Sequence, residues 1–242
     1  KDVIYYIESY DVTTIRASTP MFLLAKIIRK EFPKLKMCLS GEGSDEALGG
    51  YLYFKGAPSE REFYEETVHR VYNLHKFDCL RANKSTMASG LELRFPFLDK
   101  YFLEYVMNMH PKYKMCTDIM EKSILREAFD CNDVNTNQPW LPKKNLWRQK
   151  EAFSDGVGYS WVNTLIKHAD KRYSDLELNI SRVKYQNDPP RTKEALYFMD
   201  IFEGLFGETY KEMRDHRWLP KWIDTNAEPS ARALKWHASG LK

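Results

Sequence analysis

Apolar residues recur every three to four positions over several stretches of the chain, the spacing of an amphipathic helix. The first helix is predicted to begin at Ser18 or Thr19, with Pro20 in its first turn. A second is predicted to begin after Ser59, with Glu62 as the expected capping-box partner, and to run straight or kinked over residues 60 to about 84. Four further helices are predicted over residues 102–109, 120–129, 161–169 and 192–206.

Before residue 40 the spacing of apolar residues changes from that of a helix to a short continuous run. Residues 36–39 form a short apolar run that suits the end of a buried strand, and the small-residue loop 40–44 follows. Asp45 and Glu46 then suit the first turn of a helix. The fold class is therefore predicted to be α/β, mostly helical and with few strands. The one predicted strand needs parallel neighbours, which we expect from sequence outside this chain.

A strand, a small-residue loop and a helix start form the arrangement that binds nucleotides in open α/β sheets. Gly41 and Gly43 allow a ligand to approach the backbone closely. Three acids lie within five residues, at Glu42, Asp45 and Glu46, and an anionic loop beside phosphates is consistent with Mg²⁺ between them. Taken alone, the same loop is also consistent with a tight turn that carries solvated acids.

Composition narrows the functional classes. The 242 residues have a formal net charge of +3 with scattered Lys and Arg, which does not indicate a nucleic-acid surface. No apolar run has the length of a membrane span. The four cysteines and six histidines lack the spacing of a zinc site or of a disulfide framework. These features favour an intracellular globular protein, and a cytoplasmic location is expected.

The loop also belongs to a longer motif. Residues 40–46 read Ser-Gly-Glu-Gly-Ser-Asp-Glu, and Gly-Gly-Tyr follows at 49–51. This string resembles the synthetase domain of glutamine-hydrolysing asparagine synthetases. Further segments resemble that family in the same order, at residues 10–20, 78–84, 92–99, 120–126, 147–151 and 229–232. Together they span nearly the whole chain, whereas the polar stretch 131–144 departs from the family pattern.

Two family features do not occur in the sequence. The family has an N-terminal glutaminase domain with a catalytic cysteine, and an S-G-G-x-D-S loop that grips the pyrophosphate of ATP. Residues 1–242 are therefore interpreted as the C-terminal portion of one asparagine synthetase domain of the ATP-pyrophosphatase (adenine nucleotide α-hydrolase-like) type. Residues 210–242 are predicted to form an irregular tail. The isolated chain is expected to be catalytically silent because part of its ATP site is missing.

The resemblance implies a two-step reaction. Aspartate attacks the α-phosphorus of ATP to give β-aspartyl-AMP and pyrophosphate, and ammonia from the glutaminase domain then releases asparagine and AMP. The implied cofactors are ATP and Mg²⁺, the implied partners are aspartate and ammonia, and a homodimer is an open expectation. No nucleic-acid or membrane partner is expected.

The resemblance also implies roles for the loop residues. Ser40, Gly41 and Gly43 would contact the nucleotide. Glu42 would accept the ammonia proton or organise the acyl-adenylate. Asp45 would hold Mg²⁺ or order the loop.

Three residues outside the loop complete the predicted site. Asp78 and Arg81 lie three apart and would share a helix face, where they position aspartate or pyrophosphate, or else form an ordinary surface ion pair. Lys150 is the predicted pyrophosphate-binding lysine, and its alternative is an exposed lysine.

Two other functions stay open at this point. One is an acyl-adenylating enzyme that closes a β-lactam ring, although the intact Ser-Gly-Glu-Gly-Ser-Asp-Glu string favours amidation by ammonia. The other is a non-catalytic remnant or regulatory pseudoenzyme. The candidate residues all keep chemically competent side chains, which argues against a remnant.

Overall fold

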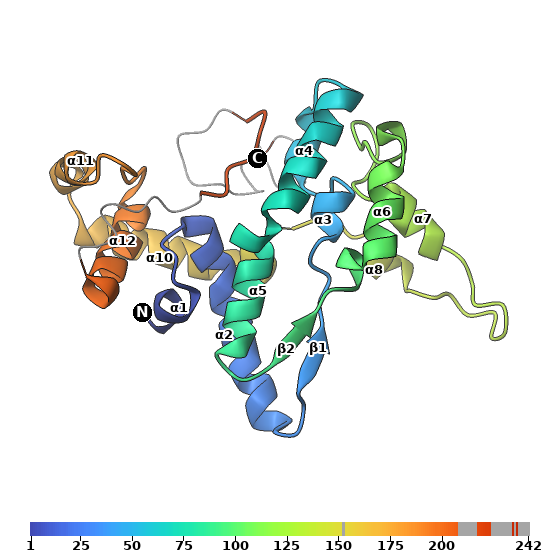
Figure 1. Cartoon of the computed structure of the whole chain (residues 1–242), viewed down its shortest axis with the longest axis horizontal. Coiled ribbons are helices and arrows are strands. Elements are labelled where there is room, and N and C mark those ends of the chain that lie inside the picture. The colour runs from blue at the N-terminus through green and yellow to red at the C-terminus, as the bar shows by residue number, and fades with distance from the viewer. Residues whose placement is uncertain (152, 208–216, 224–233, 235, 237–242) are drawn as a thin grey trace.

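A computed structural model describes residues 1–151, 153–207, 217–223, 234 and 236. The described part is mostly helical, with one small parallel sheet (Figure 1). Its strands and helices are α1 (Asp2–Ile7), α2 (Val12–Glu31), β1 (Met37–Leu39), α3 (Ser44–Ala47), α4 (Glu60–Asn73), α5 (Asp78–Met87), β2 (Glu92–Arg94), α6 (Lys100–Asn108), α7 (Ser123–Phe129), α8 (Lys143–Leu146), α9 (Phe153–Gly156), α10 (Tyr159–Arg172), α11 (Asp175–Lys184) and α12 (Lys193–Phe206).

Most of the predicted 210–242 tail lies outside the described residues. Among the helices of the described part, none combines the length and the apolar character that crossing a membrane requires.

Helix α2 begins earlier than the sequence predicts. Its N-cap is Asp11, whose carboxylate accepts a hydrogen bond from the Thr14 N–H at 2.8 Å. Pro20 lies inside the helix, and the Thr19 hydroxyl donates to the Ile15 carbonyl at 2.8 Å. The prediction of a start at Ser18 or Thr19 is therefore wrong, and the first two turns of α2 become available to line a site.

The segment predicted as one helix over residues 60–84 is two helices. Ser59 caps α4 as predicted, accepting from the Glu62 N–H at 3.2 Å. A short 3₁₀ turn, Leu74–Lys76, then separates α4 from α5. Because of this break, Asp78 occupies the first turn of α5, with Arg81 one turn later.

The predicted strand is present as β1, and it has a parallel partner within the same chain. Met37, Cys38 and Leu39 pair with Glu92, Leu93 and Arg94 of β2. The expectation that every neighbour of β1 comes from outside the chain is thus wrong. The loop that leaves β1 is anchored to β2, since the Ser40 N–H donates to the Arg94 carbonyl at 2.9 Å.

Three apolar clusters hold the helices in place. The largest joins α1, the start of α2 and α12 through residues such as Ile7, Ile15 and Phe202. A buried ion pair between Arg16 of α2 and Glu194 of α12 reinforces this contact. The second cluster packs Tyr53, Phe54 and Phe63 against Trp218 and Trp222, among others. A third cluster packs Ala47 and Leu48 against Val106 of α6. Tyr53 and Trp218 of the second cluster also line a cavity beside the loop that follows β1.

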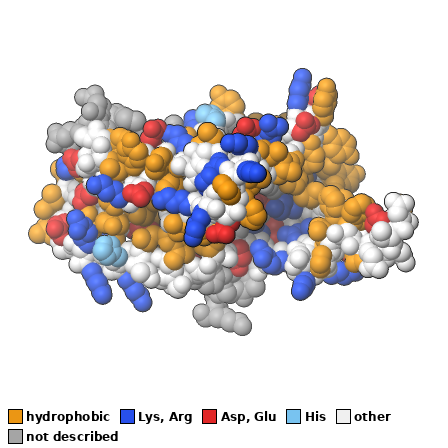
Figure 2. Space-filling view, turned by 90° about the horizontal axis from the view of Figure 1, so that it is seen from below, with side chains coloured by type: hydrophobic (Ala, Val, Ile, Leu, Met, Phe, Trp, Pro, Cys, Tyr) orange, Lys and Arg blue, Asp and Glu red, His pale blue; other side chains and the backbone are white. Residues whose placement is uncertain are grey.

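Part of the surface remains apolar. Leu23, Leu24 and Ile27 of α2 are more than half exposed, and Leu39 of β1 is 69% exposed. In Figure 2, which views the molecule from below, hydrophobic side chains lie between groups of Lys and Arg. Parallel sheets are usually covered on both faces. Further strands or helices beside β1 therefore remain a prediction.

Candidate functional site

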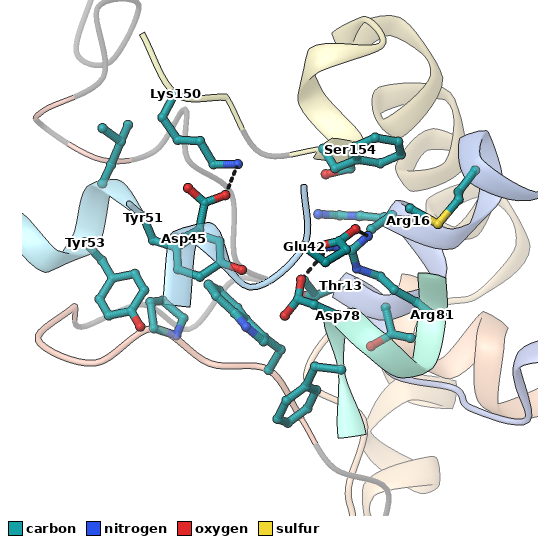
Figure 3. Close-up of a pocket in the computed structure, with 18 of the residues that line it drawn as sticks. Thr13, Arg16, Glu42, Asp45, Tyr51, Tyr53, Asp78, Arg81, Lys150 and Ser154 are labelled. Atoms are coloured by element: carbon teal, nitrogen blue, oxygen red, sulfur yellow. Dashed lines mark hydrogen bonds and ion pairs between the residues drawn. The ribbon is translucent and has the colours of Figure 1, made fainter. Parts of the chain in front are cut away.

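Seven of the eight predicted site residues line one cavity of about 310 Å³. They come from the loop after β1, α3, the start of α5 and the segment before α9. In Figure 3 the Lys150 side chain points toward Asp45, and the side chains of Glu42, Asp78 and Arg81 lie together. These residues are Ser40, Gly41, Glu42, Asp45, Asp78, Arg81 and Lys150. Positions up to 110 residues apart in sequence thus converge, because β1, α5 and the 150 segment meet at the same end of the sheet.

The eighth residue, Gly43, does not line the cavity and instead allows the turn into α3. It is the N-cap of α3 with φ of +93°, a conformation that side chains rarely adopt. A Cβ there would lie 2.3 Å from Cδ2 of Leu98. The structure therefore gives Gly43 a turning role that aims Asp45 into the cavity, and its nucleotide contact stays a prediction.

Arg81 joins the two acidic parts of the cavity. Its guanidinium donates to Asp78 at 2.5 Å and to both carboxylate oxygens of Glu42 at 3.2 and 3.3 Å. The Arg81 and Asp78 side chains are only 9% and 11% exposed, so the surface-pair alternative for them is wrong. Burial alone would lower the pKa of Arg81, but the two carboxylates outweigh it and raise that pKa above its usual range.

Glu42 occupies an environment that disfavours its charged form. Burial raises its pKa, Arg81 acts against that shift, and the nearby negative charges of Asp78 and Asp45 add to it. A carboxylate whose pKa is raised binds a proton more readily at neutral pH. Glu42 therefore has the chemistry of a proton acceptor that Arg81 holds in position.

Asp45 lies between two ammonium groups. Its carboxylate oxygens contact Lys150 at 2.8 Å and Lys122 at 2.6 Å. Burial would raise the pKa of Asp45, but Lys150 and Lys122 together hold it well below its usual range. Conversely, burial would lower the pKa of Lys150, and Asp45 raises it instead. Lys150 consequently stays cationic beside the cavity.

This pairing bears on the predicted Mg²⁺ ligand. Each oxygen of Asp45 contacts an ammonium group, and these two cations compete with a metal for the carboxylate. Within the described residues, no cluster of three or more His, Cys, Asp or Glu side chains is arranged to hold a metal. Asp45 alone does not form a metal site among the described residues, and its role as a magnesium ligand stays a prediction.

A second layer of contacts fixes Lys150. Its backbone N–H donates to the Glu121 carboxylate at 2.7 Å, and Arg126 contacts the same carboxylate oxygen at 3.0 Å. The Lys150 ammonium also lies 5.7 Å from the centre of the Tyr51 ring. The lysine is thus held by its backbone, its charge and its aromatic neighbour, unlike an ordinary surface lysine.

Sequence reasoning missed several residues of the site. Thr13 and Arg16 line the cavity from the first turns of α2, and Tyr51 lines it from the turn after α3. The Tyr51 hydroxyl donates to the buried Glu46 carboxyl at 2.5 Å. Lys122 was not missed in this way, since the sequence left it as either a residue that lines the anionic site or a solvated one, and it reaches Asp45 from a backbone conformation with φ of +55°. The segments 10–20 and 120–126 were recognised as family-like, which was the available signal, but periodicity could not show where they fold.

The Asp45–Lys122 contact requires glycine at position 50. A Cβ there would lie 2.2 Å from Oδ1 of Asp45 and 2.8 Å from Cδ of Lys122. We expect Gly50→Ala to displace the Asp45 carboxylate and to lower the rate of the site's reaction about tenfold, since sub-ångström misplacement of such groups is costly. Gly204→Ala is the control, because nothing lies within 4 Å of that position. Steady-state kinetics of both variants give the comparison, and an unchanged rate for Gly50→Ala would contradict this geometry.

A loop that leaves a parallel strand and opens on a cavity of paired charges is typical of α/β proteins that bind nucleotides and other anions. A family model described as asparagine synthase matches residues 1–67 and 55–238. The chain belongs to the asparagine synthase family.

Curated relatives agree with this assignment. The chain is 51% identical over its full length to a probable glutamine-hydrolysing asparagine synthetase of Schizosaccharomyces pombe, covering 43% of that protein. It is 51% identical over its full length to asparagine synthetase 1 of Saccharomyces cerevisiae, covering 42%. It is 54% identical over its full length to asparagine synthetase 2 of Arabidopsis thaliana, covering 40%. The chain therefore spans about two-fifths of the length of these relatives.

Proposed function

We propose that this chain carries the aspartate-activating site of a glutamine-hydrolysing asparagine synthetase. The observation that carries the proposal is the meeting of Glu42, Arg81 and Lys150 around one cavity of about 310 Å³. The site combines a held proton acceptor, a buried guanidinium and an ammonium. Those are the groups that the two steps of an acyl-adenylate amidation require.

In the first step, an oxygen of the aspartate β-carboxylate attacks the α-phosphorus of ATP. The bond from that phosphorus to the bridging oxygen breaks, and pyrophosphate leaves with the electron pair. Lys150 stabilises the negative charge that grows on the leaving group, because its raised pKa keeps the ammonium protonated. Ser40 and Gly41 lie at the end of β1, where the loop backbone is available to the nucleotide.

In the second step, ammonia attacks the acyl carbon of β-aspartyl-AMP. The bond from that carbon to the phosphate oxygen breaks, AMP leaves, and the nitrogen gives up one proton. Glu42 accepts this proton, since its pKa is raised by burial. Arg81 keeps the glutamate aimed at the cavity and balances the charge of Asp78.

The start of α2 contributes to substrate binding in this scheme. The hydroxyl of Thr13 lines the cavity and is buried, and it has no hydrogen-bond partner among the described residues. A buried hydroxyl without a partner gains from a polar ligand. We assign it a hydrogen bond to aspartate or to the acyl-adenylate.

The remaining parts of the proposal concern the whole protein. Its N-terminal region would supply ammonia from glutamine and complete an ATP-pyrophosphatase-type domain with the S-G-G-x-D-S loop. Mg²⁺ would reach the site with the phosphates of ATP. A cytoplasmic location and a homodimer belong to the same proposal, which rests on similarity to the relatives named above.

Product analysis tests this function. The intact natural protein that contains this chain should convert ATP, aspartate and ammonium into AMP, pyrophosphate and asparagine in equal amounts. Glutamine should replace ammonium as nitrogen donor. Release of ADP and phosphate would exclude the acyl-adenylate route. The absence of any aspartate-dependent turnover would favour a regulatory pseudoenzyme, and turnover of an internal-amine substrate would favour a β-lactam-forming enzyme.

A further inference from the structure

A second cavity, of about 570 Å³, adjoins the one described above. Both cavities are lined by Lys150 and Phe153, so these side chains form a shared wall. The second cavity is also lined by Lys122, Arg126, Asn145 and Arg148. None of these four residues belongs to the wall of the first cavity, so the second is a separate space that meets the site at its Lys150 side.

The lining of this second cavity is strongly cationic. Lys122, Arg126, Arg148 and Lys150 face one carboxylate, that of Glu151. Arg126 is paired with the Glu121 carboxylate and donates to the Leu146 carbonyl, so its charge is partly neutralised within the protein. Arg148 is exposed. A guanidinium with accessible donors is well suited to two oxygens of a phosphate group.

Lys122 and Lys150 add hydrogen-bond donors on the side of the second cavity that adjoins the first. Each ammonium has three N–H groups, and the structure records one contact from each to an oxygen of Asp45. Asp45 thus holds two cations close together, and its single negative charge does not neutralise both. The complementary ligand is a small anion of high charge that bridges the two ammonium groups and the guanidinium.

Resting on the function proposed above, we propose that this second cavity is an exit site for pyrophosphate, formed by Lys122, Arg148 and the outer side of Lys150. Pyrophosphate that stays next to the acyl-adenylate can react backwards. One of its oxygens then attacks the α-phosphorus, and the bond from that phosphorus to the aspartate carboxylate breaks. Movement of pyrophosphate past Lys150 separates it from the acyl-adenylate. The acyl-adenylate can then react only with ammonia.

The first test is binding of inorganic pyrophosphate to the intact protein without nucleotide, measured by isothermal titration calorimetry. We expect Arg148→Gln to weaken binding about tenfold, the size of a lost charge-assisted contact. Lys144→Gln is the matched control, because it removes an exposed cation four residues away that does not line the cavity. Its affinity for pyrophosphate should stay within about twofold of wild type, in line with the small effect of exposed charges.

A kinetic measurement separates this inference from the proposed function. Pyrophosphate should inhibit asparagine synthesis as a product, and Arg148→Gln should raise its inhibition constant about tenfold while Lys144→Gln does not. Equal pyrophosphate binding by wild type and Arg148→Gln would overturn the exit site, even if asparagine is made. Weakened binding in a protein that makes no asparagine would leave the anion site standing and would overturn the proposed function instead. Equal losses in both variants would show only general charge attraction and would also overturn the site.

Discussion

Replacing Lys150 by alanine should abolish aspartate-dependent pyrophosphate release from the intact protein, with a loss of about 10²–10³-fold in kcat. The ammonium is the cation that the structure places at the junction of both cavities, and Asp45 keeps it charged by raising its pKa. Removing it takes away the charge that is proposed to stabilise the leaving pyrophosphate. A steady-state assay of pyrophosphate, with and without aspartate, measures this effect.

Two controls show whether the loss is local. Glutamine hydrolysis by the intact protein should continue in Lys150→Ala, because that reaction is proposed to occur in a different domain. Lys150→Arg should retain part of the activity, since it keeps the charge but changes its geometry. Normal asparagine synthesis by Lys150→Ala would remove this lysine from the reaction.

Arg81→Met should damage both the stability and the chemistry of the site. It leaves Glu42 and Asp78 without the guanidinium that they share in a buried setting. Breaking a buried ion pair by removing one partner costs about 3–5 kcal/mol of unfolding free energy. The pKa of Glu42 should rise further, because Arg81 now acts against its upward shift. The protonated glutamate could no longer accept the ammonia proton at neutral pH, so asparagine formation should fall about 100-fold or more.

Urea denaturation and asparagine assays of the same preparation measure the two effects of Arg81→Met. The matched control is Arg61→Met, which removes an Arg–Glu contact on the surface of α4, where the Arg61 side chain is 86% exposed. That variant should unfold and react like wild type. If Arg81→Met matched Arg61→Met in both assays, the buried Asp78–Arg81–Glu42 arrangement would be wrong.

The loop after β1 could be predicted because its signals are local. An apolar run, two glycines and two first-turn acids follow each other within eleven residues, and each indicates the conformation of its immediate backbone. The cap at Ser59 is local in the same sense, and it is confirmed. The family resemblance then supplied seven residues that the fold brings to one cavity.

The missed features depend on distant contacts. Arg81 meets Glu42 across 39 residues of sequence, and Lys122 meets Asp45 only because Gly50 leaves room for it. Strand β2 has three residues, too few for a recognisable alternation. The α2 start was misplaced because Ser-Thr-Pro is a strong local helix-start signal, whereas packing of Val12 and Ile15 in the core favours the earlier start at Asp11. In each case tertiary packing outweighed local preference.

The central claim is that aspartate is activated as an acyl-adenylate at this site. The most direct measurement uses aspartate labelled with ¹⁸O in its β-carboxylate, with mass analysis of the products made by the intact protein. The account predicts one ¹⁸O atom in the phosphate of AMP, because the attacking carboxylate oxygen stays on the α-phosphorus when ammonia displaces AMP. Appearance of the label in pyrophosphate or inorganic phosphate, or its complete retention in asparagine and aspartate, would contradict the account.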